Sequence, residues 1–146
     1  MLVACLGNET LRSTIVTELD YAFVAEFAKV DEGKLTVVGA SYLEVRVPHF
    51  PYHHVVAVAG RIRSNRDAEP FPFKVSFNAP GTEAELVIEG TIDPAGSPQL
   101  YGDKAGILFS VTNTVLLTGP GLCEIFIYID GEQVRRLAFD VLPEAV

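Results

Sequence analysis

Hydrophobic and polar residues alternate along most of the chain. The clearest case is FPFKVSFN, residues 71–78, in which every second side chain is Phe or Val and the side chains between include Lys74 and Asn78. A strand with one buried face explains this spacing, because successive side chains of a strand point to opposite faces. The same alternation runs through residues 34–47, 55–62, 84–92, 105–119 and 123–142. The pattern predicts β-strands throughout and no convincing amphipathic helix.

The segment AELVIEGTI, residues 84–92, predicts a strand with a strongly acidic outer face. Its alternation places Leu86, Ile88 and Ile92 inward, and Glu83, Glu85 and Glu89 outward. Carboxylates spaced in this way could bind a hard cation. They are more typical of a soluble edge strand, on which charge prevents pairing with other chains.

Turn residues separate the alternating runs. Asp130-Gly131 lies between two β-rich runs and is the strongest hairpin signal in the chain, because a type I′ turn needs positive φ at both central positions. The run at residues 105–119 is expected to break near Asn113. About eight short strands with regular turns predict an all-β fold, an antiparallel β-sandwich of immunoglobulin-like or jelly-roll-like type. Residues 1–14 show no sustained period and are predicted to be a flexible N-terminal extension before a single domain, residues 15–146.

The net charge and the length of the apolar runs indicate which classes of partner to expect. The 146-residue chain has a formal charge of −8, which disfavours nucleic acid as a partner because binding to phosphates needs a basic surface. A local anion-binding stripe is the alternative, formed by Arg61, Arg63, Arg66 and Lys74. No run approaches the roughly 18 apolar residues that a membrane-spanning helix needs, so no membrane span is expected.

The two cysteines do not form a disulfide framework, because Cys5 and Cys123 lie far apart and Cys5 falls in the predicted extension. Cys123 alternates in phase with three isoleucines and is expected to be a buried small hydrophobic residue. The sequence LVAC, residues 2–5, resembles the end of a bacterial lipoprotein signal. A surface-anchored lipoprotein is therefore an alternative if the true start of the protein lies upstream of Met1.

All three histidines lie in HFPYHH, residues 49–54. His49, His53 and His54 are candidate metal ligands if a turn at Pro51 brings them together, since an extended strand would hold His49 and His53 roughly 13 Å apart. No acidic residue occurs in residues 47–60 to complete a zinc site, so a structural loop between two strands is the favoured interpretation. No nucleophile elbow, phosphate loop or zinc-protease motif is present. The residues therefore predict no cofactor and favour a non-catalytic protein over an enzyme.

Two stretches, residues 22–40 and 119–141, resemble a family of small bacterial and phage-associated β-sandwich proteins classed as a domain of unknown function. The matching positions are Glu26, Ala28, Val30, Gly33, Lys34, Leu35 and Gly39 in the first stretch, and Asp130, Gly131 and Phe139 in the second. The family's glycine-aromatic step before the last strand pair is replaced here by Leu122-Cys123. The resemblance implies an antiparallel sandwich in the cytoplasm and assigns no activity or catalytic residue.

The sequence thus predicts an uncharacterised, acidic protein-binding or assembly module that uses loops or an exposed strand edge. Tyr52 and Tyr101 are the candidate partner-binding residues, and the partner is another protein or a second copy in a homo-oligomer. The alternatives are a metal-binding domain or metal-dependent enzyme centred on the histidine loop, and the anchored lipoprotein.

Overall fold

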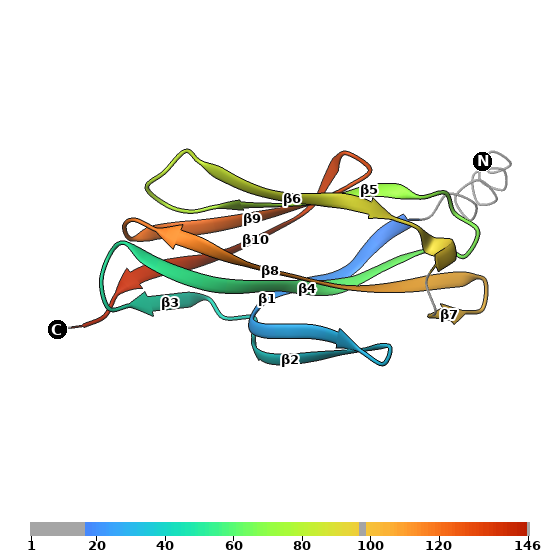
Figure 1. Cartoon of the computed structure of the whole chain (residues 1–146), viewed down its shortest axis with the longest axis horizontal. Helices are drawn as coiled ribbons and strands as arrows, with labels where there is room; N and C mark the ends of the chain where they lie inside the picture. The colour runs from blue at the N-terminus through green and yellow to red at the C-terminus, as the bar shows by residue number, and fades with distance from the viewer. Residues whose placement is uncertain (1–16, 97–98, 146) are drawn as a thin grey trace, which may run out of the picture.

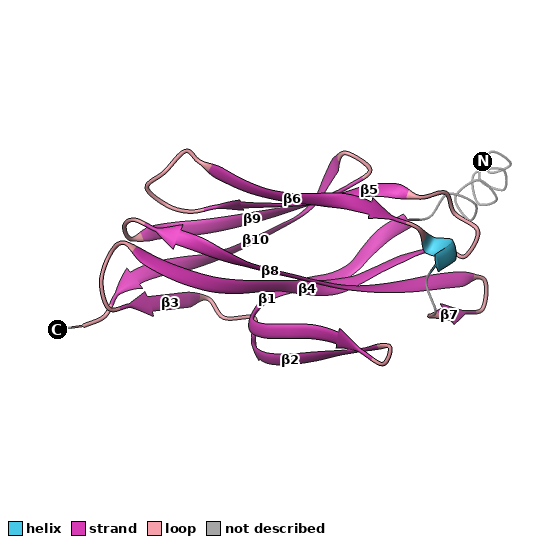
Figure 2. Cartoon of the chain, viewed as in Figure 1, coloured by secondary structure: helices cyan, strands magenta, loops and turns pink. Residues whose placement is uncertain are grey.

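Two β-sheets packed face to face make up the part of the chain that the computed structural model describes, residues 17–96 and 99–145 (Figure 1). Apart from one short 3₁₀ turn, η1 (Pro94–Gly96), the regular structure there is strand (Figure 2). The predicted all-β sandwich is confirmed. The predicted extension, residues 1–14, and the Cys5 motif lie outside the described residues.

Each sheet has five strands. The first has the order β2 (Lys34–Ala40), β1 (Thr17–Asp31), β4 (Tyr52–Asn65), β8 (Lys104–Leu117) and β7 (Leu100–Tyr101). The second has the order β3 (Glu44–Val47), β10 (Glu132–Pro143), β9 (Gly121–Ile129), β5 (Phe71–Asn78) and β6 (Glu85–Ile92). All neighbours are antiparallel except β3 and β10, which are parallel. The described residues thus form ten strands where about eight were expected, because β2 and β3 fall within one alternating run, residues 34–47, and β7 has only two residues.

The main core lies between the two sheets. The alternate apolar side chains of the central strand β4, Val56, Val58 and Ile62, are fully buried. They meet those of β5, as predicted for the segment at residues 71–78, and the rings of Phe73 and Phe109 lie 4.9 Å apart across the core. Burial of these side chains is the main force that holds the two sheets together.

β8 continues without the break expected near Asn113. It pairs with β4 in one unshifted register along its whole length, from Tyr52 opposite Leu117 to Asn65 opposite Lys104. Asn113 disturbs the strand little because its Oδ1 atom accepts a hydrogen bond, at 3.0 Å, from the backbone N–H of Thr114. The side-chain oxygen of Asn113 is therefore satisfied beside its own strand.

The β1–β2 hairpin packs on the outer side of the first sheet and forms a second, smaller core. Four alanines make its centre, Ala25 and Ala28 from β1 and Ala57 and Ala59 from β4. The Ser110 hydroxyl of β8 donates a hydrogen bond, at 2.9 Å, to the Ala28 carbonyl. In Figure 1 the hairpin lies on the side of β4 away from β6. The small alanine side chains let the two layers approach closely.

The predicted turn at Asp130-Gly131 is confirmed. It connects β9 to β10 with Ile129 opposite Glu132, and its residues have φ values of 54° and 81°. Both values are positive, as a type I′ turn requires. Within residues 17–96 and 99–145, the structure contains no helix that could span a membrane.

Candidate functional site

One edge of β8 is open over the second half of the strand. On one side, β8 pairs with β4 throughout; on the other, β7 pairs only with Lys104 and Ala105. The Gly106 N–H also donates to the Gln99 carbonyl, at 2.8 Å. Beyond this point, residues 111–117 have no strand on that side within residues 17–96 and 99–145.

The backbone groups at this edge alternate in direction. Because the Gly106 N–H points toward β7, the N–H and C=O groups of every second residue after it point to the same side. In the open part these residues are Thr112, Thr114 and Leu116. The hydrogen bond from the Thr114 N–H to its neighbour's side chain agrees with this direction. The open edge therefore presents strand donors and acceptors that can pair with another chain.

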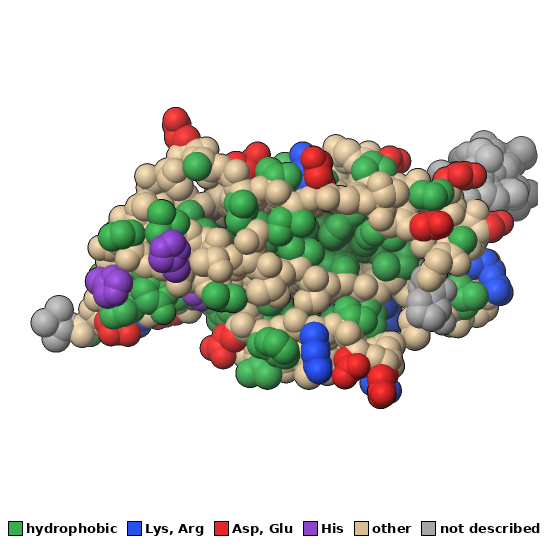
Figure 3. Space-filling view, in the orientation of Figure 1, with side chains coloured by type: hydrophobic (Ala, Val, Ile, Leu, Met, Phe, Trp, Pro, Cys, Tyr) green, Lys and Arg blue, Asp and Glu red, His purple; other side chains and the backbone are tan. Residues whose placement is uncertain are grey.

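An apolar groove of about 300 Å³ runs beside the open edge, between β8 and the β5–β6 hairpin. Phe77 of β5 and Val115 of β8 are buried residues of its lining, at 1% and 5% exposure. Leu86 and Leu116 line it too and are 39% and 44% exposed. Figure 3 shows hydrophobic side chains gathered in the region between β6 and β8.

The groove forms where the inner face of β6 is only partly covered by the first sheet. Leu86 pairs with Phe77, and Ile88 pairs with Val75, so these residues of β6 share the inner face of the second sheet. The predicted inward direction of Leu86, Ile88 and Ile92 is therefore confirmed. Their burial is incomplete, since β7, the strand next to β8 in the described first sheet, pairs only with Lys104 and Ala105 and no strand lies beside the rest of β8.

The charge beside the groove is acidic. Glu85 is the only charged residue of the groove lining among the described residues. Its side chain lies at the rim, on the face of β6 opposite to that of Leu86, where its Oε2 atom accepts a hydrogen bond from the Ser76 hydroxyl, at 2.7 Å. Glu83 and Glu89, close by in sequence, are exposed. Lys74 pairs with Glu89 in register, and its ammonium lies over the ring of Tyr128, 4.2 Å from the centroid.

The histidine loop lies at one end of the sandwich, where the histidine side chains appear on the left of Figure 3. His53 and His54 are consecutive in β4, so their side chains point to opposite faces. His49 donates from Nδ1 to the Pro51 carbonyl, at 3.1 Å, and its ring lies 5.8 Å from that of Tyr52. His54 turns toward the core, with Nε2 3.2 Å from the Tyr42 hydroxyl.

These histidines are not gathered around a common point. Within residues 17–96 and 99–145, no group of three or more His, Cys, Asp or Glu side chains could hold a metal ion. A metal site at His49, His53 and His54 stays a prediction. Native mass spectrometry of protein purified without chelators tests it, because a stoichiometric metal must disappear in the His53→Ala, His54→Ala double variant.

The buried titratable groups near this end favour their neutral forms. Burial lowers the pKa of His54, although the carboxylate of Glu26 acts in the opposite direction. Burial also raises the pKa of Tyr42, with smaller contributions from Cys123 and Glu26. The pKa of the fully buried Cys123 thiol is raised to about 12, mainly by burial. Cys123 is a buried small residue as expected, with little thiolate to act as a nucleophile.

Tyr52 and Tyr101 lie at opposite ends of the sandwich. Tyr52 pairs with Leu117 at the end of β8, whereas Tyr101 pairs with Lys104 at its start. At the rise of a β-strand, these two positions are about 40 Å apart. Tyr52 packs against the main core, and Tyr101 is 47% exposed. The two tyrosines therefore cannot belong to one small binding surface, and their individual roles stay predictions.

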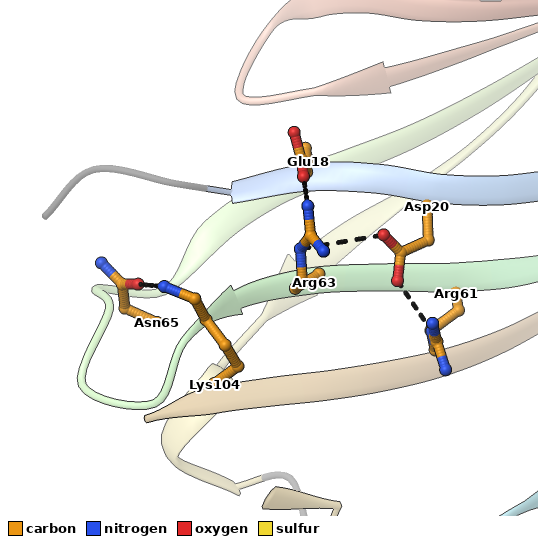
Figure 4. A network of polar contacts seen from close by, with 6 residues as sticks. All are labelled: Glu18, Asp20, Arg61, Arg63, Asn65 and Lys104. Carbon is orange, nitrogen blue, oxygen red and sulfur yellow. Dashed lines mark hydrogen bonds and ion pairs between the residues drawn. The ribbon is translucent and has the colours of Figure 1, made fainter. Parts of the chain in front are cut away.

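The predicted basic stripe is divided between the two sheets and partly neutralised. Arg61 donates from Nε to Asp20, at 2.8 Å, and Arg63 pairs with Glu18 (Figure 4). Lys104, in the same view, donates to the Asn65 side chain at 2.7 Å. Lys74 belongs to β5 of the second sheet. Carboxylates of β1 thus occupy Arg61 and Arg63, while Arg66 donates to the Gly102 carbonyl, at 3.2 Å.

Sequence reasoning did not single out the groove, although one signal of it is present. Residues 105–123 contain no charged side chain, and this run includes the open part of β8. Because edge strands commonly carry charge that prevents pairing, such a run at an edge indicates a contact surface. The signal could not be used from sequence alone, because alternation does not show which strand lies at an edge.

Comparison with known proteins gives a family and no activity. The model of a family described as "Family of unknown function (DUF6941)" matches residues 20–142. The matched range extends from β1 to β10 and includes every residue of the groove named above. No curated protein matches the chain.

Proposed function

Because the chain belongs to the family of unknown function DUF6941, which assigns no activity, we propose its function from the geometry: a non-catalytic module that binds a protein partner in the groove between β8 and β6. The observation that carries this proposal is the open, uncharged edge of β8 beside exposed Leu86 and Leu116. Contiguous apolar surface next to unpaired strand groups is typical of protein-binding sites.

The location and the class of partner belong to the same proposal. A cytoplasmic location is supported by the family resemblance and by Cys123, which is a free, buried thiol of the kind that a reducing compartment maintains. A protein partner rather than nucleic acid is supported by the net charge of −8 and by the pairing of Arg61 and Arg63 with carboxylates. Nucleic-acid binding would need these arginines to be available.

Site-specific photo-cross-linking tests the proposed function. A photoreactive amino acid replaces Leu116 in the groove, and in a matched variant it replaces Arg136, which is exposed on β10 of the second sheet. In cells that produce the protein from its own gene, we expect position 116 to give a covalent adduct with one defined protein and position 136 to give none. The proposal fails if position 116 gives no adduct, or if both positions give the same adducts.

A further inference from the structure

We propose that the partner enters the groove as an extended strand, which pairs with the open edge of β8, covers the inner face of β6 and carries a lysine or arginine at the acidic rim of the groove. This inference rests on the proposed function and specifies the form and the charge of the partner. Three independent features of the described residues support it.

The backbone of β8 supports a strand rather than a helix or a loop as the occupant. Thr112 and Leu116 direct their N–H and C=O groups to the open side, and only an extended chain can satisfy a row of such groups. The Thr114 N–H between them is bonded to the side chain of Asn113. This bond lies at the surface and can be exchanged for one to an incoming strand.

The side chains of β6 support the same occupant. A strand added to β8 lies about 4.8 Å beyond it in the first sheet, which is where the cover over Leu86 and Ile88 is missing. Every second side chain of the added strand would then point into the groove, above Phe77 and next to Val115. Small or medium apolar residues fit a groove of about 300 Å³, so the partner strand alternates apolar and polar residues.

The charges favour a basic partner over a second copy of the chain. Glu85, at the rim, is the one charged residue among the described residues of the groove lining, and Glu89 lies on the same face of β6. Two copies joined through β8 would bring their β6 strands, with exposed Glu85 and Glu89, toward each other. Each copy also carries a net charge of −8. A strand with a lysine or arginine instead meets an opposite charge, which favours association.

The experiment uses a synthetic peptide of about nine residues, a usual strand length, in which valine and threonine alternate and one lysine stands near each end. The readout is amide hydrogen exchange of the full chain. At about 1 mM peptide, we expect exchange at Thr112 and Leu116 to slow by about tenfold or more. Amides of β3, at the opposite edge of the second sheet, should keep their rates. Unchanged exchange along β8 overturns the proposal.

Two isomeric peptides separate strand pairing from simple apolar binding. One is N-methylated on its threonine amides and the other on its valine amides, so that each loses the donors of one strand edge. We expect one isomer to lose affinity by about tenfold or more and the other to bind like the parent peptide. Antiparallel addition predicts that the threonine isomer is the weak one. Equal affinity of the two isomers overturns strand addition.

Protein variants and charge reversal complete the test. Thr112→Pro removes one N–H group that β8 directs to its open side, so it should weaken binding of the peptide. Thr112→Val keeps this N–H group and should leave binding unchanged. A peptide with glutamate in place of lysine should bind about tenfold more weakly at low salt, and unchanged affinity would overturn the basic partner. If the protein alone forms dimers that protect β8, a second copy is the occupant and the proposed partner is wrong.

The two proposals can fail separately. A partner cross-linked at position 116, together with unchanged exchange along β8, would keep the binding function and overturn strand addition. Protection of β8 by the peptide without any cross-linked partner would keep the pairing chemistry and overturn the proposed function.

Discussion

At the scale of single residues, His54 couples the stability of the fold to pH. Its folded-state pKa is lowered from 6.5 by burial, against the opposing charge of Glu26, while Tyr42 and Phe139 pack beside it. As pH falls below the unfolded value, the unfolded chain binds a proton more readily than the folded protein does. The contribution of neutral His54 to stability is therefore complete above pH 6.5 and is lost as pH falls toward the lowered folded pKa.

The first prediction concerns this histidine. Between about pH 7.5 and about pH 5.5, the free energy of unfolding should decline less steeply in His54→Gln than in the wild-type protein. Urea denaturation at each pH measures the slope. His53→Gln, on the opposite face of the same strand, controls for the loss of a histidine. An identical slope in His54→Gln and the wild type would contradict the assignment of pH sensitivity to His54.

The second prediction compares two apolar residues that the sequence pattern treats alike. Phe73 is buried against Phe109 in the main core, so Phe73→Ala should lower the free energy of unfolding by about 3–5 kcal/mol. Leu86→Ala should cost about 1 kcal/mol or less, because that side chain is 39% exposed and no strand of the described first sheet packs over it. Chemical denaturation gives both values. Equal costs would mean that Leu86 is covered in solution.

Phe73 and Leu86 also show which structural properties can be predicted from the sequence. Alternation correctly predicts that Phe73 and Leu86 point inward, because direction is a local property of a strand. It does not predict that Leu86 is exposed, since exposure depends on whether a strand from the other sheet lies opposite. The sandwich and its inward faces are thus predictable from the sequence, and the groove is not.

At the scale of elements, the β9–β10 turn depends on a backbone conformation rather than on contacts. Gly131 has a φ of 81°, and no atom lies within 4 Å of the position that a Cβ would occupy. The third prediction is that Gly131→Ala lowers the free energy of unfolding by about 1–2 kcal/mol, the cost of left-handed backbone for an L-residue.

Gly119→Ala is the matched control for the turn. Gly119 also has open space at the Cβ position, and its φ lies outside the positive region. This variant should change stability by less than about 0.5 kcal/mol. Thermal and urea denaturation of both variants measure the difference. Equal effects would show that the turn does not require the conformation described here.

β8 illustrates the limits of sequence reasoning for an element. The expected break near Asn113 was wrong because the sequence shows a polar residue in an apolar run but not where its side chain bonds. In the structure that side chain bonds to the neighbouring N–H and the strand continues. The histidine loop shows the converse. Three histidines in six residues attract attention in the sequence, while the strand separates His53 from His54.

At the scale of the whole molecule, the two halves of β1 belong to different parts of the structure. The first half of β1 pairs with β4, from Thr17 opposite Ser64 to Ala25 opposite Ala57. The second half pairs with β2 and belongs to the hairpin over the alanine core. The smaller core has fewer and smaller buried side chains than the main core. We therefore expect local opening of the hairpin to cost less free energy than separation of the two main sheets.

The fourth prediction follows from charge over the whole molecule. The net charge of −8 keeps copies apart at neutral pH, and this repulsion disappears near the isoelectric point of about 4.8. Light scattering should rise as the pH approaches about 5. Thr112→Lys places a charge at the open edge of β8 and should reduce the scattering more than the same change at exposed Thr36 of β2. Equal scattering of the two variants would contradict a role for β8.

The uncharged edge of β8 thus has a consequence for colloidal behaviour. Most of the surface disperses the protein by electrostatic repulsion, whereas the open part of β8 presents backbone groups that can attract a second copy at short range. At physiological ionic strength, salt limits the reach of this repulsion to about 8 Å. It does not weaken the hydrogen bonds of a paired strand to the same degree. Acid and high salt should therefore precipitate the protein through the same seven-residue segment, residues 111–117, and a bound partner strand should keep it dispersed.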